Sequence, residues 1–131
     1  MKKILFILLF TIPFIGFGQS TTEINKFLSE TSSTLNQNTP MVIDEYTTLI
    51  NTFGGIGMFI YNYQVDKNVF LDYGISESSW LVLQTEILKN TFCTDPSFDI
   101  FRSFDIDLVW RYSDMYGVFI AKITLNGKDC K

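Results

Sequence analysis

The chain has 131 residues, of which 47% are hydrophobic, and a formal net charge of −4 at pH 7. It contains no histidine. This excludes histidine as a general base, zinc binding through imidazole, and serine or cysteine nucleophiles that a histidine activates. The excess of acidic residues also argues against nucleic-acid binding, which needs a positive surface. We therefore expect no nucleic-acid partner.

The first 18 residues are typical of a secretory signal peptide. Two lysines precede an apolar stretch over residues 4–15, and small residues precede the expected cleavage site before Gln19. The stretch is too short for a membrane span, which needs about 20 apolar residues. Removing residues 1–18 leaves 113 residues with 8 Lys and Arg against 14 Asp and Glu, a net charge of −6. We expect a single α+β domain over residues 19–131, a periplasmic or secreted location, and no stable membrane anchor after cleavage.

Two cysteines, Cys93 and Cys130, remain in the expected mature chain. An even number of cysteines in an exported protein predicts a disulfide, and with only two the pairing is fixed. In the chain-entropy model, closing a loop of this length contributes about 3–4 kcal/mol to stability. A reactive thiol would need a CxxC motif or a cationic neighbourhood, and neither is present near Cys93.

A helix is predicted from about Thr21 to Asn36. Ser20 and Glu23 form a capping-box pattern at its start, and Pro40 prevents its continuation. One narrow helical stripe carries Ile24, Phe27, Leu28, Thr31 and Leu35.

From Met41 onward the pattern alternates with a period of two, which predicts a β-hairpin whose strands flank a glycine-rich turn over residues 54–57. We expect Leu49, Asn51 and Phe53 to share one face of the first strand. The glycines could instead suggest a phosphate-binding loop, but such loops lead into a helix, and here strands lie on both sides. Residues 69–73 are expected to be a short extended segment.

A second helix is predicted from Ser76–Ser79 to about Asn90. Its apolar residues cover a broad arc, which favours a central helix of the core: Trp80, Leu81, Leu83, Ile87, Leu88 and Phe92. Asp95 and Pro96 then predict a short helical turn that continues to Arg102.

A second hairpin completes the chain, with strands over residues 106–112 and 118–125. The order helix, hairpin, helix, hairpin predicts an α+β fold in which two helices pack on one face of an antiparallel four-stranded sheet. Strict alternation places Phe119, Ala121, Ile123 and Leu125 on the face toward the helices.

The uncovered face of this sheet is the candidate interaction surface. It mixes apolar and polar side chains, as recognition surfaces and homodimer interfaces do, although exposed sheets are commonly rich in β-branched residues for other reasons. The candidate residues are Met58, Ile60, Asn62, Val109, Arg111, Ile120 and Lys122. The leading interpretation is a non-enzymatic binding or accessory domain that recognises a protein partner or itself through this face.

The alternative interpretation is a carboxylate-dependent hydrolase acting on envelope polysaccharide. Paired carboxylates perform glycoside hydrolysis when a cleft holds them a fixed distance apart. Helix caps and turns are the competing explanation for the acids of the C-terminal third, namely Asp95, Asp99, Asp105, Asp107 and Asp114. Residues 99–107 place large apolar side chains where a calcium loop alternates ligands. We therefore expect no catalytic residue, metal or cofactor.

Five short motifs are spread over nearly the whole mature chain: Pro40-Met41-Val42 followed by Asp44 and Thr47; Tyr61-Asn62-Tyr63; Cys93 followed by Asp95-Pro96; Trp110-Arg111-Tyr112 followed by Asp114 and Gly117; and Asp129-Cys130. In this order they resemble a family of small exported bacterial proteins, mostly uncharacterised, with a signal peptide and a late cysteine pair. The resemblance implies this fold and the disulfide, and it assigns no activity.

Overall fold

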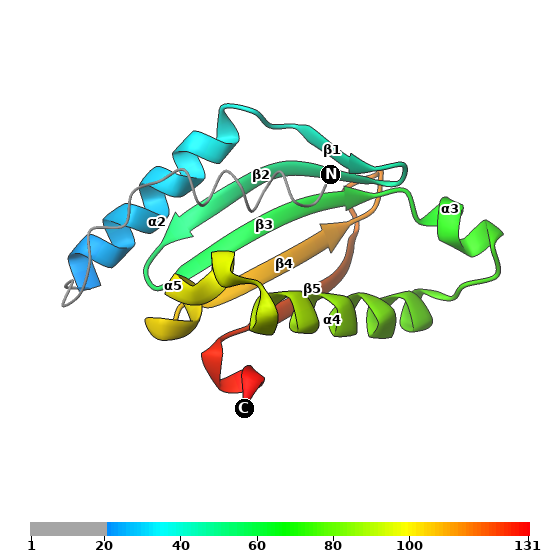
Figure 1. The fold of residues 1–131 in the computed structure, drawn as a ribbon. Helices are drawn as coiled ribbons and strands as arrows, with labels where there is room; N and C mark the ends of the chain where they lie inside the picture. Colours follow the sequence, from blue (N-terminus) through cyan, green and yellow to red (C-terminus); the bar gives the residue numbers. More distant parts are fainter. Residues whose placement is uncertain (1–20) are drawn as a thin grey trace.

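The computed structural model describes residues 21–131 (Figure 1); the expected signal peptide, residues 1–18, lies outside the described residues. A five-stranded sheet is covered on one face by helices (Figure 1). The strands are β1 (Met41–Asp44), β2 (Thr47–Gly55), β3 (Met58–Val65), β4 (Asp107–Ser113) and β5 (Phe119–Leu125). The helices are α2 (Thr21–Asn36), α3 (Lys67–Asp72), α4 (Glu77–Thr94) and α5 (Asp99–Ser103), with 3-10 turns η1 (Pro96–Phe98) and η2 (Gly127–Cys130).

The strands lie in the order β1-β2-β3-β4-β5. All neighbours pair antiparallel except β3 and β4, which are parallel. The α+β class is confirmed, but the four-stranded, fully antiparallel sheet is wrong. The added strand, β1, has only four residues, too few to show a period of two in the sequence. The parallel pair follows from the long helical connection between β3 and β4, since parallel neighbours need a crossover rather than a hairpin.

Helix α2 has the predicted bounds and is attached to β2 by a polar clamp. The pairing of β1 with β2 ends at Leu49, so further along β2 the backbone has no strand on that side. There the Asn36 side chain makes the hydrogen bonds that a neighbouring strand would make. Its Nδ2 donates to the Thr52 carbonyl at 2.9 Å, and its Oδ1 accepts from the Thr52 amide at 2.7 Å. Ser32 and Thr52 also share a buried hydroxyl–hydroxyl bond of 2.8 Å. The end of α2 is therefore fixed in register with β2.

Gly54 lets the backbone of α2 approach β2 closely. A Cβ atom at this position would lie 2.1 Å from the Leu28 carbonyl oxygen, far inside van der Waals contact. Only glycine fits here without moving the helix.

We predict that Gly54→Ala lowers the free energy of unfolding by at least about 1–3 kcal/mol, because the helix must move away from the sheet to accommodate the methyl group. Urea denaturation followed by circular dichroism measures this change. Ser33→Ala, at an exposed position of the same helix, is the control and should alter stability by less than about 0.5 kcal/mol. An unchanged unfolding midpoint for Gly54→Ala would contradict the close approach.

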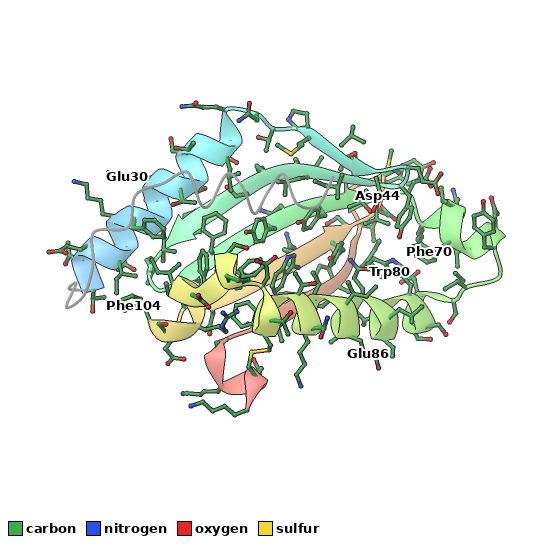
Figure 2. The ribbon with its side chains drawn as sticks, viewed as in Figure 1. Glu30, Asp44, Phe70, Trp80, Glu86 and Phe104 are labelled. Atoms are coloured by element: carbon green, nitrogen blue, oxygen red, sulfur yellow. A yellow bond between two sulfur atoms is a disulfide. The ribbon has the colours of Figure 1, made fainter. Side chains whose placement is uncertain are left out.

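Residues 69–73 are not extended, because most of this segment belongs to α3. The Asp66 carboxylate caps this helix by accepting from the Asn68 amide. The single turn of helix buries Phe70, which stacks on Trp80 with ring centres 5.3 Å apart. Figure 2 labels the two residues close together, on the inner side of α3 and near the start of α4. One buried aromatic side chain therefore fixes a helix too short to show a period of its own.

Helix α4 is longer than predicted and is not central. It begins after Ser76, whose hydroxyl caps the helix by accepting from the Ser79 amide, and continues to Thr94. Only Trp80 and Phe92 are buried, and Ile87 remains 48% exposed. The helix runs along the β5 side of the sheet (Figure 1), so much of its broad apolar arc does not face the core.

Aromatic side chains of β3 and β4 form the centre of the core. The parallel register pairs Tyr61 with Trp110 and Tyr63 with Tyr112, and the paired rings stack with centres 5.9 and 5.2 Å apart. Burial raises the pKa of Tyr61, Tyr63 and Tyr112 above the ordinary value. The neighbouring tyrosines raise the pKa of Tyr63 further, whereas a hydrogen bond from Gln84 partly offsets the shift at Tyr112.

These tyrosines predict loss of stability at alkaline pH. Their folded pKa values lie above the value of about 10 expected in the unfolded chain. Below pH 10 both states hold the phenolic proton; above it the unfolded state releases protons that the folded state retains, so the free energy of unfolding falls as pH rises. Urea titrations from about pH 8 to 12, with tyrosinate absorbance as a second signal, measure this. Ionisation of the three buried tyrosines is expected to coincide with unfolding, whereas the exposed Tyr73 and Tyr116 report on neither state. Ionisation of Tyr61, Tyr63 and Tyr112 with the fold intact would contradict the prediction.

Candidate interaction surface

The sheet face opposite the helices is left open by the described residues. Along β3, the buried side chains of Phe59, Tyr61, Tyr63 and Val65 alternate with partly exposed ones on the other side. Helix α2 bonds to Thr52, and α4 packs Phe92 against Trp110. Thr52 and Trp110 both pair with Tyr61, so both long helices lie on the same side. We call the opposite side the open face.

Strand register arranges the open-face side chains in rows that cross the strands. The apolar row consists of Phe53, Ile60 and Val109, and the neighbouring polar row consists of Asn51, Asn62, Arg111 and Lys122. Val109 is only 7% exposed. The apolar row is therefore more buried on β4 than on β2, where Phe53 is 49% exposed.

Direct contacts fix the side chains of the polar row. Asn62 Nδ2 donates to Asn51 Oδ1 at 2.8 Å. The Arg111 guanidinium lies 5.3 Å from the centre of the Phe119 ring, a distance typical of a cation–π contact. Beside this row lies a hollow of about 400 Å³, whose walls include Ile50, Gln64, Arg111 and Ser113.

Six of the seven predicted surface residues lie on the open face: Met58, Ile60, Asn62, Val109, Arg111 and Lys122. Ile120 does not, because it packs against the core. The register shifts between Tyr112 and Ser113, which pair with Ala121 and Phe119 and leave Ile120 as the extra residue of a bulge. Phe119, before the bulge, therefore lies on the open face, whereas Ala121, after it, lies on the helix side.

Alternation alone places three open-face residues on the helix side: Asn51, Phe53 and Phe119. A second bulge, at Ile50, reverses the phase of β2, so Asn51 pairs with Asn62 while Leu49 still pairs with Tyr63. The run Val118-Phe119-Ile120-Ala121 is apolar throughout, so either phase fits the pattern. The sequence carries no signal that selects between the two.

The β4–β5 turn projects an apolar tip beside the open face. Asp114 Oδ1 accepts from the amides of Tyr116 and Val118 at 2.8 and 2.9 Å, and Gly117 adopts a φ of +80°. The Tyr116 side chain is 91% exposed, and Met115 and Val118 are more than half exposed. A buried carboxylate therefore holds the turn that presents these apolar side chains.

We predict that Asp114→Ala lowers the free energy of unfolding by about 1–3 kcal/mol, because two amides lose the charged oxygen that accepts from them. Amide hydrogen exchange localises the effect: faster exchange is expected at Tyr116 and Val118 and little change in α2. Asp72→Ala, at an exposed position at the end of α3, is the control. Equal exchange rates in the two variants would argue against the carboxylate as the support of the turn.

A second apolar surface lies on α4, away from the open face. Val82, Leu83 and Ile87 are each about half exposed on this helix. Glu86 lies among them and points away from the sheet (Figure 2). Leu83 and Ile87 belong to the broad apolar arc from which the sequence predicted a central core helix.

The C-terminal aspartates are engaged in structural contacts. Asp95 caps η1 by accepting from the Ser97 amide at 2.9 Å. Asp107 accepts from the Asn126 side chain at 3.1 Å, and Asp114 holds its turn. Asp99 pairs with Arg102, and Asp105 lies 3.8 Å from the Lys128 amine. Within residues 21–131, no group of three or more His, Cys, Asp or Glu is placed to hold a metal ion.

The predicted disulfide between Cys93 and Cys130 is confirmed. It joins the last turn of α4 to η2, whose start is fixed by a capping box between Asn126 and Asp129. The Arg102 guanidinium donates to the carbonyls of Phe92 and Asp95. This arrangement ties the chain end to the helix layer.

No protein-family model and no curated protein matches the chain. Solved structures do match. A Pseudomonas aeruginosa protein described as secreted shares 14% identity, with a TM-score of 0.70 over 87% of this chain and 100% of that one. EpsS, a pilotin of the Vibrio vulnificus type II secretion system, shares 11% identity, with a TM-score of 0.68 over 85% of this chain and 94% of that one. The Vibrio cholerae type II secretion pilotin AspS shares 11% identity, with a TM-score of 0.62 over 84% and 94% of the two chains.

What is shared is the fold. The three solved structures share 11–14% identity with this chain. At these identities they assign no residue of this chain a role. None of the helices described for residues 21–131 has the length and apolar content that a membrane crossing requires.

Proposed function

We propose that this chain is an exported, non-enzymatic accessory domain that recognises a protein partner, or a second copy of itself, through the open face of its sheet. The observation that carries the proposal is the one-sided packing of the fold. Both long helices cover the same side of the sheet, and the opposite side keeps an ordered apolar row next to a polar row. A surface of this composition is suited to protein recognition.

The composition of the open face supports binding rather than chemistry. The side chains of its two rows are apolar groups, amides and cations, which are suited to contacts with another chain. The five C-terminal aspartates that a carboxylate-dependent hydrolase would use are engaged in caps, turns and side-chain contacts on separate elements. The hydrolase alternative therefore has no observation in its favour.

The comparisons supply context for the proposed role. Two of the proteins that share this fold are pilotins of type II secretion systems, so the fold occurs among protein components of a secretion system. An accessory role in the bacterial envelope is the corresponding proposal for this chain.

We predict that Ile60→Asp abolishes partner recovery from the native cell envelope, because it places a charge in the apolar row. Ile87→Asp, the same substitution at an exposed site of α4, is the matched control and should retain the partner. Quantitative mass spectrometry of cross-linked complexes measures the recovery, and sedimentation of the purified variants detects self-association. Circular dichroism checks that both variants fold. Recovery of the same partner by Ile60→Asp and wild type would contradict the proposed surface.

A further inference from the structure

Two cations stand side by side at the end of the polar row. Arg111 on β4 and Lys122 on β5 are paired residues of an antiparallel register, and both are exposed. Paired positions on one face of such a pair place Cβ atoms about 4.5–5.5 Å apart, and like charges at this separation destabilise the sheet. The two positive charges of Arg111 and Lys122 therefore repel each other in the folded state, and replacing either residue would remove this repulsion.

None of the acidic residues described neutralises these cations. The ion pairs formed within residues 21–131 use Lys26, Lys67, Arg102 and Lys128 instead. On the same face, Asp107 accepts from Asn126. Asp114 beside the hollow is buried and holds the turn. The positive charge of Arg111 and Lys122 is thus available to another molecule.

The rest of the chain has the opposite charge. Residues 21–131 contain 14 Asp and Glu against 8 Lys and Arg. An acidic partner would be repelled by most of this surface and attracted at the Arg111–Lys122 pair, which gives docking a preferred orientation. The Phe119 ring beside the guanidinium limits the positions that Arg111 can adopt, so less order is lost when a carboxylate binds.

We propose that the open face binds an acidic segment of a protein partner, with carboxylates at Arg111 and Lys122 and apolar side chains on the neighbouring row around Ile60. This inference rests on the proposed function and adds the chemistry of the partner. A segment of this kind would meet both rows at once, because the rows are adjacent on the same strands. A lipid surface is the less suitable occupant. The protein has an excess of acidic residues, and an extended anionic lipid surface would repel the parts of the protein that surround the two cations.

The test is Lys122→Glu, for which stability and binding should change in opposite directions. Replacing the repulsion by an attraction to Arg111 should raise the melting temperature by a few degrees. The same change should weaken binding of a fluorescent peptide of mixed Glu and Leu residues by about tenfold or more at low salt. Lys89→Glu is the control, because it gives the same change in net charge at an exposed site of α4.

The full chain, expressed with its own leader and recovered from the periplasm, is titrated with this peptide, with its Lys–Leu counterpart and with phosphatidylglycerol vesicles. Binding of the acidic peptide alone, lost in Lys122→Glu and kept in Lys89→Glu, supports the proposal. Absence of peptide binding, equal binding by both variants, or binding of vesicles in place of the peptide overturns it. If Ile60→Asp loses the envelope partner and Lys122→Glu keeps it, the open face is the binding surface but the partner is not bound through carboxylates at Arg111 and Lys122. If both variants keep the envelope partner, the proposed function itself is wrong.

Discussion

The parallel pairing of β3 with β4 is the constraint on which the rest of this fold depends. It joins two antiparallel units, β1-β2-β3 and β4-β5, into one sheet. Two stacked pairs, Tyr61 with Trp110 and Tyr63 with Tyr112, cross this junction on the helix side. A parallel pair requires a connection that returns over the sheet, and α3, α4 and α5 all belong to that connection. Because α2 is attached to the same side through Thr52, the helices accumulate on one face.

The two faces of the sheet therefore differ in what a substitution does. On the helix side, large aromatic rings and a close backbone approach at Gly54 leave little room for change. On the open face, contacts such as those between Asn62 and Asn51 or Arg111 and Phe119 join neighbouring surface side chains. The identity of these side chains is therefore less restricted by folding. The unfavourable pairing of Arg111 with Lys122 lies on this side, where a small loss of stability is tolerated. Because the core is fixed by aromatic stacking on the other side, substitutions on the open face should have little effect on folding.

The sequence was informative where one local signal decided the structure. The stripe and bounds of α2, the Asp95 cap and the pairing of the two cysteines each depend on neighbouring residues or on the redox compartment, and these predictions are confirmed. Ser20, on which the predicted capping box of α2 depends, lies outside the described residues. Elements that depend on distant contacts could not be predicted: β1 is too short to show a period, and α3 is fixed by the stacking of Phe70 on Trp80. The bulges at Ile50 and Ile120 lie in runs that fit either phase, so the open face was predicted without Asn51, Phe53 and Phe119.

The disulfide has a mechanical consequence. Cys93 and Cys130 are 37 positions apart, and the loop they close contains α5, β4 and β5. A pull on the carboxyl end of the chain is transmitted through the sulfur atoms to the last turn of α4, and β5 carries no tension. The edge strand therefore cannot be peeled from β4 by force on that end. This connection would let the domain bear traction on that end without exposing the aromatic stack beneath its helices.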